Sequence, residues 1–397
     1  MTENALYTLW LLLAGKQGSA RTFRLIKAME AREAYHATKA ELIPILGEKD
    51  AGCFLNKDLR PARKIIDECR SKGIQIVCYH DPAYPPSLRE IEEPPPALFF
   101  TGSLPDPQTP KIGVVGTRKC TRSAAAMAAS FACSLAASGF QIISGMAEGI
   151  DTYAHKGPLQ KGFGSFAVLG CGVDVLYPKT NGVLYDLLKE HGGLISEYLP
   201  GTPPLAHHFP RRNRIISGIS DGILVVECPP KSGSMSTARY AVEQNRTLFA
   251  LPADPSDRVN TGTNQLIKHG AVFCTEPGDI INEFLPRFGD RIHPVSVRFI
   301  PAEAKEVRPT EQPPEKPKKK PKKAPEEPEK KKSPTPPPPL SPEETTVYRA
   351  LGEDEALPAD EICRRTGLPF HRILPLLQAL ELSGCIESLP GSLFRRK

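Results

Sequence analysis

Between residues 111 and 284, short apolar runs rich in β-branched side chains alternate with stretches of helical periodicity. The apolar runs predict seven strands, at residues 112–115, 141–144, 165–169, 193–196, 222–227, 247–251 and 271–274. The stretches between them predict helices at residues 121–138, 150–161, 181–191, 211–220, 234–245 and 263–269. Strands that are apolar throughout and alternate with helices favour an α/β fold, in which a mostly parallel sheet is covered on both faces.

Prolines mark the end of this region on its C-terminal side. Of the 42 prolines in the chain, 14 lie between residues 301 and 342, together with 10 lysines and no aromatic residue. Such a segment cannot bury enough apolar surface to offset its ordering entropy, which predicts a disordered Pro/Lys-rich linker over 301–342. We interpret its lysine runs as solvated charge that keeps the linker extended, with phosphate contact as the alternative.

The remaining segments predict two smaller domains. Helical periodicity at residues 4–14, 20–35, 38–46 and 59–71, followed by a β-like run at 74–79, indicates a helical domain over 1–80. Residues 81–110 are then expected to form an ordered, turn-rich connector that leads into the main domain at 111–290. Residues 343–397 predict three helices followed by a hairpin, which is the order of elements in a winged helix.

The cysteines and the hydropathy argue against a metal site and a membrane anchor. None of the 10 cysteines forms a C-x₂-C or C-x₄-C step or lies three or four residues from a histidine, so we expect no metal. Most of them lie in apolar runs, which is typical of reduced thiols in the cytoplasm. No apolar run approaches the ~20 residues of a membrane span, and no signal-peptide pattern is present. We therefore expect a cytoplasmic protein.

Two of the loops that follow predicted strands are suited to phosphate. Ligands of parallel sheets bind at the carboxyl ends of the strands, so these loops are where function is expected. One loop offers Gly116, Thr117 and Arg118 before a helix, and another offers Lys231, Ser232 and Ser234 before a helix. Free N–H groups at a helix start, hydroxyl groups and a guanidinium together favour an anion. The glycines of the loop that begins at Gly145 serve either tight packing or binding.

The densest basic cluster of the α/β region lies at residues 207–214. It reads His207-His208-Phe209-Pro210-Arg211-Arg212-Asn213-Arg214 and continues directly into an apolar helix. A solvated charged face is the alternative interpretation. We favour phosphate binding, because arginines at such a helix start would point at a ligand over the edge of the sheet.

The sequence lacks the motifs of several common enzyme classes. There is no P-loop, no dinucleotide fingerprint after the first strand and no nucleophile elbow. Asp151 and His155 are expected to form a local hydrogen-bonded pair, with acid–base chemistry as the alternative. Glu197 and Glu227 each stand at a strand end and suit either catalysis or pairing with arginines. Because no nucleophile–base set is evident, we expect neither catalysis nor a cofactor.

In order and spacing, these loops together resemble the DNA-processing protein A family. The matching segments cover nearly all of residues 111–275. They are Val114-Val115-Gly116-Thr117-Arg118, Ser144-Gly145-Met146-Ala147-Glu148-Gly149-Ile150-Asp151 with His155, Val168-Leu169-Gly170-Cys171-Gly172-Val173-Asp174 with Tyr177-Pro178, Ile195-Ser196-Glu197, Phe209-Pro210-Arg211-Arg212-Asn213-Arg214-Ile215-Ile216, Lys231-Ser232-Gly233-Ser234 with Thr237-Ala238, and Gly262-Thr263-Asn264. The N-terminal helices resemble the sterile-alpha-motif-like domain of some members, and residues 343–397 resemble the winged helix that many members carry.

The resemblance implies a Rossmann-like module that binds single-stranded DNA as a homodimer and acts without a bound nucleotide. It implies a recombination mediator that protects incoming strands during natural transformation and loads the RecA recombinase. The DNA-binding residues would be Gly116, Thr117, Arg118, Gly145, Phe209, Arg211, Arg212, Asn213, Arg214, Lys231, Ser232 and Ser234. In three places the chain departs from the family: Thr117 stands where a serine is usual and keeps the hydroxyl group, Glu148 stands where an arginine is usual, and Pro252-Ala253 replaces Pro-Gly.

Two other functions are weighed against this one. The loop Ser232-Gly233-Ser234-Met235-Ser236-Thr237 with Glu243 distantly echoes a motif of nucleotide-processing enzymes of the lysine-decarboxylase-like group. A transcription factor that uses the winged helix is disfavoured, because residues 343–397 hold 7 basic and 9 acidic residues. Its expected recognition helix offers only His371 and Arg372, whereas duplex binding needs several phosphate contacts.

Overall fold

The computed structural model describes residues 3–254, 261–294, 341–351, 357–368, 370–383, 385–389 and 393–396. The chain divides into two compact units, Met1–Val307 and Arg308–Lys397, and each is described by itself. The linker predicted over 301–342 lies outside the described residues except for its last two positions. None of the helices that the structure describes combines the length and the apolar character that a membrane span requires.

The first unit is built on a nine-stranded sheet in the order β1-β2-β6-β5-β4-β3-β7-β8-β9. The strands are β1 (Gln75–Cys78), β2 (Ala97–Gly102), β3 (Lys111–Val115), β4 (Gln141–Ser144), β5 (Ser165–Val168), β6 (Gly192–Ser196), β7 (Gly222–Val225), β8 (Thr247–Ala250) and β9 (Val272–Phe273). All pairings from β6 to β9 are parallel. The seven predicted strands and the mostly parallel α/β fold are therefore confirmed.

Strands β1 and β2 extend this sheet in the antiparallel sense, and the sequence did not predict the second of them. In the register, Phe99 of β2 lies opposite Ile76 of β1 and Ser196 of β6. Residues 97–100 are all buried, which explains why this run forms a strand despite the prolines that precede it. The segment expected to be a connector thus contributes a strand, and the sheet begins before residue 111.

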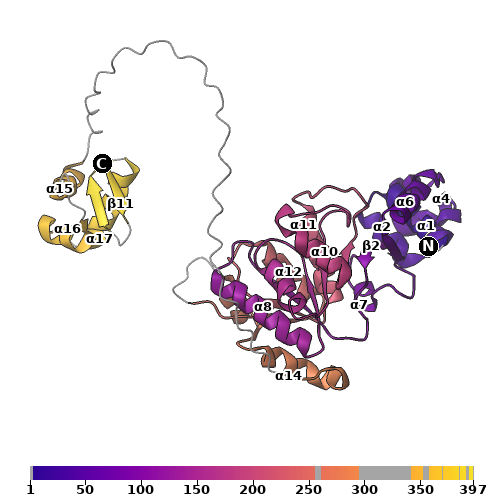
Figure 1. The fold of residues 1–397 in the computed structure, drawn as a ribbon. Helices are drawn as coiled ribbons and strands as arrows, with labels where there is room; N and C mark the ends of the chain where they lie inside the picture. The colour runs from indigo at the N-terminus through magenta and orange to yellow at the C-terminus, as the bar shows by residue number, and fades with distance from the viewer. Residues whose placement is uncertain are drawn as a thin grey trace, which may run out of the picture. The chain divides into compact units, whose positions relative to one another are not determined.

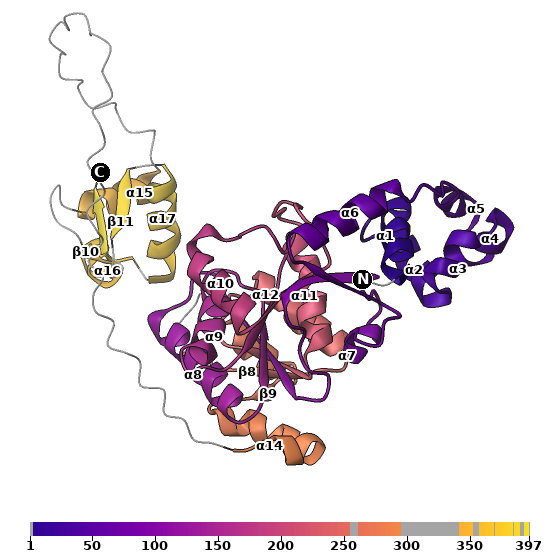
Figure 2. The ribbon, with the colours of Figure 1, turned by 45° about the vertical axis from the view of Figure 1, so that its right-hand side comes forward.

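Helices cover both faces of the sheet. One core contains Val115 and Val225, and the other contains Val114 and Leu224, because successive strand residues point to opposite faces. In Figure 2 the strands run between α8 and α9 on one side and α11 and α12 on the other. The covering helices are α7 (Pro86–Arg89), α8 (Arg122–Ala137), α9 (Ile150–Leu159), α10 (Gly182–Glu190), α11 (His208–Ile219), α12 (Gly233–Glu243), α13 (Gly262–Lys268) and α14 (Pro277–Phe288).

The N-terminal helices form a group beside β2 (Figure 1). They are α1 (Glu3–Gly15), α2 (Ala20–Ala28), α3 (Ala31–His36), α4 (Lys39–Leu46), α5 (Glu48–Ala51) and α6 (Arg60–Ser71). Their core includes Trp10 and Phe54 and extends to Phe99 of β2, so the group packs on the end of the sheet. The sequence predicted a single helix over 20–35, but the structure has two helices there, α2 and α3. A capping box between Glu30 and Glu33 starts the second helix.

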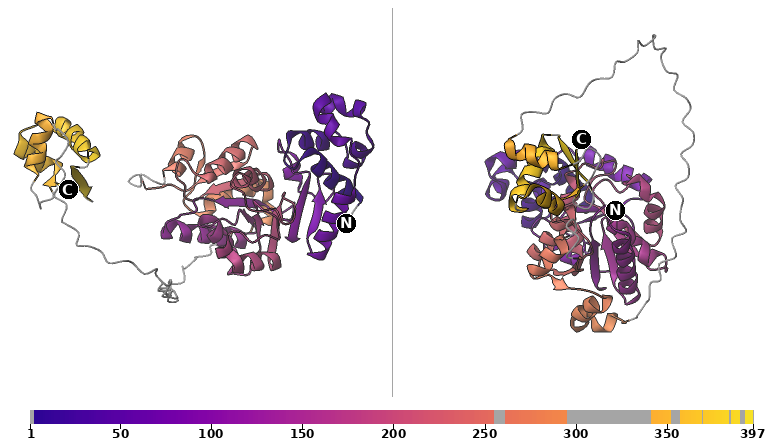
Figure 3. Two further views of the ribbon diagram at one scale, coloured as in Figure 1. Left: turned by 90° about the horizontal axis from the view of Figure 1, so that it is seen from above. Right: turned by 90° about the vertical axis from the view of Figure 1, so that its left-hand side faces the viewer.

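The second unit is a winged helix, as the sequence predicted (yellow in Figure 3). It contains α15 (Pro342–Ala350), α16 (Ala359–Thr366), α17 (Phe370–Leu382) and a small sheet of β10 (Leu357–Pro358), β11 (Ile386–Leu389) and β12 (Leu393–Arg396). Val347, Ile362 and Leu377 lie in its core. Gly367 ends α16 at a φ of 72°, a left-handed conformation that favours glycine.

The crossing of α8 and α9 provides a test of the packing. A methyl group at Gly157 of α9 would lie 2.9 Å from the Cα atom of Ala129 in α8, which is closer than the backbones allow. We expect Gly157→Ala to lower the free energy of unfolding by about 1–3 kcal/mol, the usual cost of overpacking. Gly182→Ala in α10 is the matched control, since its nearest neighbour would lie 3.7 Å away. Equal chemical denaturation curves for the two variants would contradict this packing.

Candidate functional site

The topology of the sheet creates a crevice between β3 and β7. From β3 the chain adds β4, β5 and β6 on one side, and from β7 it adds β8 and β9 on the other. Ligands of open α/β sheets bind at such a switch point, outside the carboxyl ends of the strands. A cavity of about 320 Å³ lies there. The predicted residues that line it are Gly116, Thr117, Arg118, Phe209, Arg212, Asn213, Ser232 and Ser234.

The loop after β3 is fixed by contacts with Glu227, which follows β7. The backbone N–H of Thr117 donates to the Glu227 carbonyl (2.7 Å), and the N–H of Thr121 donates to its carboxylate (2.8 Å). Thr121 in turn caps α8 by accepting from the N–H of Ala124 (3.1 Å). Glu227 therefore anchors the loop that carries Arg118, through the backbone contacts of Thr117 and Thr121.

Arg118 and Arg212 lie near the same aromatic ring. Arg118 is exposed, and its guanidinium carbon lies 5.2 Å from the centre of the Phe209 ring. The guanidinium carbon of Arg212 lies 5.9 Å from the same centre. Two cations and a half-buried aromatic ring thus converge on the cavity, which suits a ligand that is both anionic and aromatic.

Arg212 is held rigidly while it faces the cavity. Its Nη1 donates to the carbonyls of Gly145 (2.7 Å) and Val168, and its Nε donates to the side-chain oxygen of Asn213 (3.2 Å). Burial lowers the pKa of Arg212 to about 10, so its side chain is still a cation at neutral pH. A Cβ atom at Gly145 would lie 2.5 Å from Nη2 of Arg212, which explains the glycine after β4.

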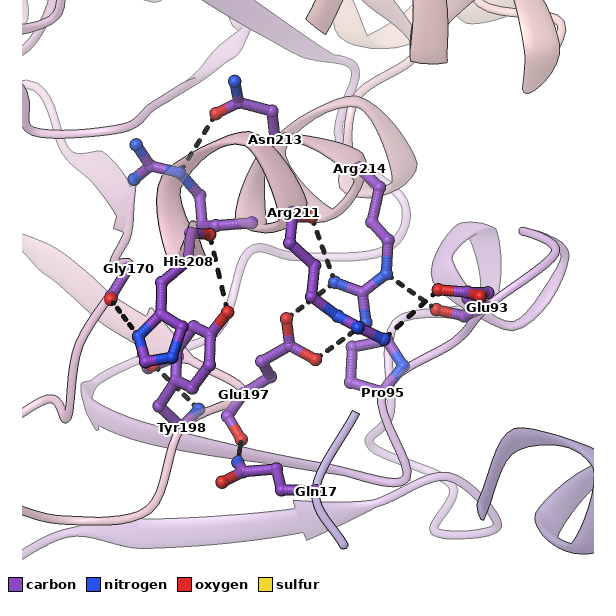
Figure 4. A network of polar contacts seen from close by, with 12 residues as sticks. Gln17, Glu93, Pro95, Gly170, Glu197, Tyr198, His208, Arg211, Asn213 and Arg214 are labelled. Carbon is purple, nitrogen blue, oxygen red and sulfur yellow. Dashed lines mark hydrogen bonds and ion pairs between the residues drawn. The ribbon is translucent and has the colours of Figure 1, made fainter. Parts of the chain in front are cut away.

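The other two arginines of the cluster do not line this cavity. Arg211 and Arg214 are three residues apart on α11 and share a face, whereas Arg212 is turned by about 100° from Arg211. Arg214 binds both carboxylate oxygens of Glu197 at 2.7 Å, and Arg211 pairs with Glu93 at 3.2 Å (Figure 4). Burial works against the charge on Arg214, but Glu197 outweighs it and raises the pKa of Arg214.

This second face of α11 contacts the N-terminal helices. The side-chain amide of Gln17 donates to the carbonyl of Glu197 (Figure 4). The ring of Phe23 lies 5.4 Å from the guanidinium carbon of Arg211 and 5.7 Å from that of Arg214. The pairing of Glu197 with an arginine, one of the two interpretations of the sequence, is thus observed. No sequence signal pointed to Gln17 or Phe23, which lie far away along the chain.

The first turn of α12 closes the cavity from the β7 side. Ser232 precedes the helix, and its hydroxyl group is hydrogen-bonded to that of Ser234. The amide of Asn213 joins this turn to α11 by donating to the Gly233 carbonyl (3.2 Å). The free N–H groups of a helix start attract anions. Lys231 is exposed beside this turn and is not among the residues that line the cavity.

The pair predicted between Asp151 and His155 is wrong. The ring of His155 turns toward the sheet, and its Nδ1 contacts the hydroxyl of Ser165 at 2.7 Å. Asp151 instead lines the cavity, with 6% of its surface exposed. Burial raises the pKa of Asp151 to about 6, although the charge of Arg212 acts in the opposite direction. Within the described residues, no group of three His, Cys, Asp or Glu side chains is arranged to hold a metal ion.

Comparisons with known proteins match both units. The family described as DNA recombination-mediator protein A matches residues 75–285, and the DprA winged helix domain matches residues 331–392. Protein Smf of Synechocystis sp. is 33% identical over 342 residues, which is 84% of this chain and 83% of the relative. DNA processing protein DprA of Streptococcus pneumoniae is 41% identical over 224 residues, which is 56% of this chain and 74% of the relative. The X-ray structure of DNA processing protein A from Streptococcus pneumoniae matches with a TM-score of 0.62 and 33% identity, over 70% of this chain and 97% of that chain.

The raised pKa of Asp151 predicts a pH-dependent stability difference. A carboxyl group whose pKa is higher in the folded state stabilises the fold when protonated, and this contribution is lost as the pH rises from about 4, its ordinary pKa, through about 6. Asparagine cannot ionise, so Asp151→Asn should gain stability relative to the parent as the pH rises from about 4 to about 6, and the difference should level off above about 7. Thermal unfolding across this range measures the difference. A difference that stays constant would show that Asp151 does not titrate there.

Proposed function

The chain belongs to the DNA recombination-mediator protein A family, and we propose that its α/β unit binds single-stranded DNA in the cavity between β3 and β7. The observation that carries this proposal is the convergence of Arg118, Arg212 and the start of α12 on one cavity. Each of the three attracts a phosphate group. The chain would thereby protect incoming strands during natural transformation.

The aromatic ring in the cavity supports a single strand over a duplex. Bases of a single strand can leave their stack and pack on an aromatic side chain, whereas paired bases cannot. Phe209 offers such a ring, with Arg118 close to it. We assign the phosphate to Arg118, Arg212, Thr117 and the hydroxyl groups of Ser232 and Ser234.

The remaining predicted residues take other parts in this proposal. Lys231 is exposed next to Ser232 and is suited to the neighbouring phosphate of the strand. Gly116 leaves room for Ile150 and the Glu227 carbonyl, and Gly145 leaves room for Arg212. Asn213 holds α11 to α12. Arg211 and Arg214 do not contact the ligand in this proposal; they contribute indirectly, because they fix the position of α11. The three arginines therefore do not form a continuous row along the backbone of the DNA.

We propose binding without catalysis. The hydroxyl groups of the cavity have Asp151 nearby, but the adjacent histidine, His155, is engaged with Ser165. The alternative is a nucleotide-processing enzyme. Incubation with nucleoside monophosphates distinguishes the two, since release of free base would contradict a pure binding function.

The exposed edge of the sheet supports a homodimer. Within the residues that the structure describes, strand β9 ends the sheet, and its residues Val272 and Phe273 are 36% and 56% exposed. An unpaired edge strand with apolar side chains is a site for pairing with another chain. We propose that two copies pair through β9 about a twofold axis, which would place two cavities in one particle.

We propose that the protein, once bound to DNA, interacts with the RecA recombinase. Support comes from the description of the family as a recombination mediator. All ten cysteines are free thiols, in accord with action in the reducing cytoplasm. Faster assembly of RecA on single strands in the presence of the protein would support this role.

Replacing an exposed cation of the cavity tests DNA binding directly. We expect Arg118→Ala to weaken oligo-dT binding about tenfold, and to reduce the salt slope by about 1, because one charge-assisted phosphate contact is lost. Fluorescence anisotropy at several salt concentrations measures both quantities. Arg239→Ala is the matched control: it removes an arginine of α12 that pairs with Glu243 outside the cavity. Equal losses in the two variants would contradict the site.

A charge at the edge strand tests the dimer. We expect Phe273→Arg to give a monomer, because two buried arginines would face each other across the pairing edges. Val183→Arg is the control, since Val183 is 80% exposed on α10 away from this edge. Light scattering during size-exclusion chromatography gives the mass. A dimer that persists in Phe273→Arg would reject pairing through β9.

A further inference from the structure

One residue that lines the cavity, Asp151, has no role in the proposed binding of phosphate. Asp151 places a carboxylate among the cationic and hydroxyl groups of the lining. A negative charge there repels a phosphate group. At 6% exposure the side chain is also largely shielded from water, so its charge is not solvated in compensation.

The carboxylate of Asp151 has acceptor capacity to spare. The backbone N–H of Ala147 approaches it at 3.4 Å, a long hydrogen bond, and the backbone N–H of Gly145 also donates to it. An ionised carboxylate offers about four lone-pair sites, so about two are left for a ligand. The Arg212 guanidinium is committed through Nη1 to the carbonyls of Gly145 and Val168. Nη1 is therefore held by the strand ends, although the charge of Arg212 still favours the ionised form of Asp151.

Such a residue lowers the stability of the empty protein. Its pKa, raised to about 6, shows that the folded state disfavours the ionised form. A buried carboxylate that costs stability and still faces a binding cavity is suited to a ligand that brings its own donors. Phosphate oxygens only accept hydrogen bonds, so the donors must come from another part of the nucleotide.

We propose that Asp151 is a specificity-determining residue whose carboxylate accepts hydrogen bonds from the edge of a nucleobase, so that the cavity takes one nucleotide by its phosphate and its base together. This inference rests on the proposed binding of single-stranded DNA. Arg118 and Arg212 hold the phosphate, and Asp151 contacts the base. The volume of about 320 Å³ lies at the lower end of the ~300–1,000 Å³ range of small-ligand pockets, which fits a single nucleotide.

The chemistry of the bases then sets an order of preference. Guanine presents two adjacent donors on its pairing edge, the ring N–H and the exocyclic amine, and these match the two oxygens of a carboxylate. Thymine presents a single N–H between two carbonyl oxygens, which a carboxylate repels. A bidentate contact of this kind is worth about tenfold in affinity or more.

The test compares oligo-dT with the same strand carrying single guanines at spaced positions, at a pH above the pKa of Asp151. We expect the wild-type protein to bind the guanine strand about tenfold more tightly. A third strand replaces each guanine by hypoxanthine, which lacks the exocyclic amine, and it should lose most of the preference. This comparison uses the wild-type protein and does not depend on the folding of a variant.

Two substitutions separate base contact from structure. Asp151→Asn should lose the preference for guanine while its affinity for oligo-dT rises, since a negative charge that repels phosphate leaves the cavity. Glu148→Gln is the matched control and should keep the preference, because Glu148 is exposed on the same loop and accepts from Thr180 at 2.9 Å. Equal affinity of the wild type for the guanine and thymine strands would overturn the inference and leave the proposed function intact. A preference that persists in Asp151→Asn would also overturn it, and binding of none of the strands would overturn both.

Discussion

The buried ion pair between Arg214 and Glu197 determines where α11 lies on the sheet. Both side chains are almost fully buried, and the guanidinium meets both carboxylate oxygens at 2.7 Å. Buried charges are tolerated only when paired with good geometry, so the helix has one position in which this pair is satisfied. Glu197 follows β6, while Arg212 of the same helix binds the carbonyls at the ends of β4 and β5. The two arginines thus attach α11 to three strand ends.

This attachment has a direct consequence for binding. Only one arginine of the 211–214 cluster, Arg212, lines the cavity, and it does so in a fixed orientation. Its partner Arg118 comes from the loop after β3, which Glu227 holds in place. In the proposed mode of binding, affinity for DNA rests on a few well-placed cations and a helix start, and we propose that the carboxylate of Asp151 adds selectivity. The Gln17 and Phe23 contacts mean that the N-terminal helices support the same helix from its other side.

The sequence predicted which loops meet at the cavity, because the topology of the sheet alone decides this. Gly116, Arg118 and Ser232 follow parallel strands, and the carboxyl ends of such strands meet at one edge whatever the rest of the fold does. The sequence could not predict which arginines line the cavity and which form ion pairs. Helical periodicity separates Arg212 from Arg211 and Arg214, but it does not say which face of α11 meets the sheet. Strand β2 could not be predicted because the prolines that precede it signal a turn, while its apolar residues find partners in β1 and β6. Asp151 was assigned to His155 by spacing, and the buried Ser165 proved the better partner for that ring.

We propose above all that a single strand occupies the cavity between β3 and β7. Photo-crosslinking tests it most directly: a single-stranded oligonucleotide with a photoreactive base is irradiated on the full chain, and the modified peptides are identified by mass spectrometry. We expect crosslinks to Phe209 and to the loops that begin at Gly116 and Ser232, and we expect them to be lost when unlabelled single strand competes. Crosslinks confined to the winged helix or to the N-terminal helices would contradict it.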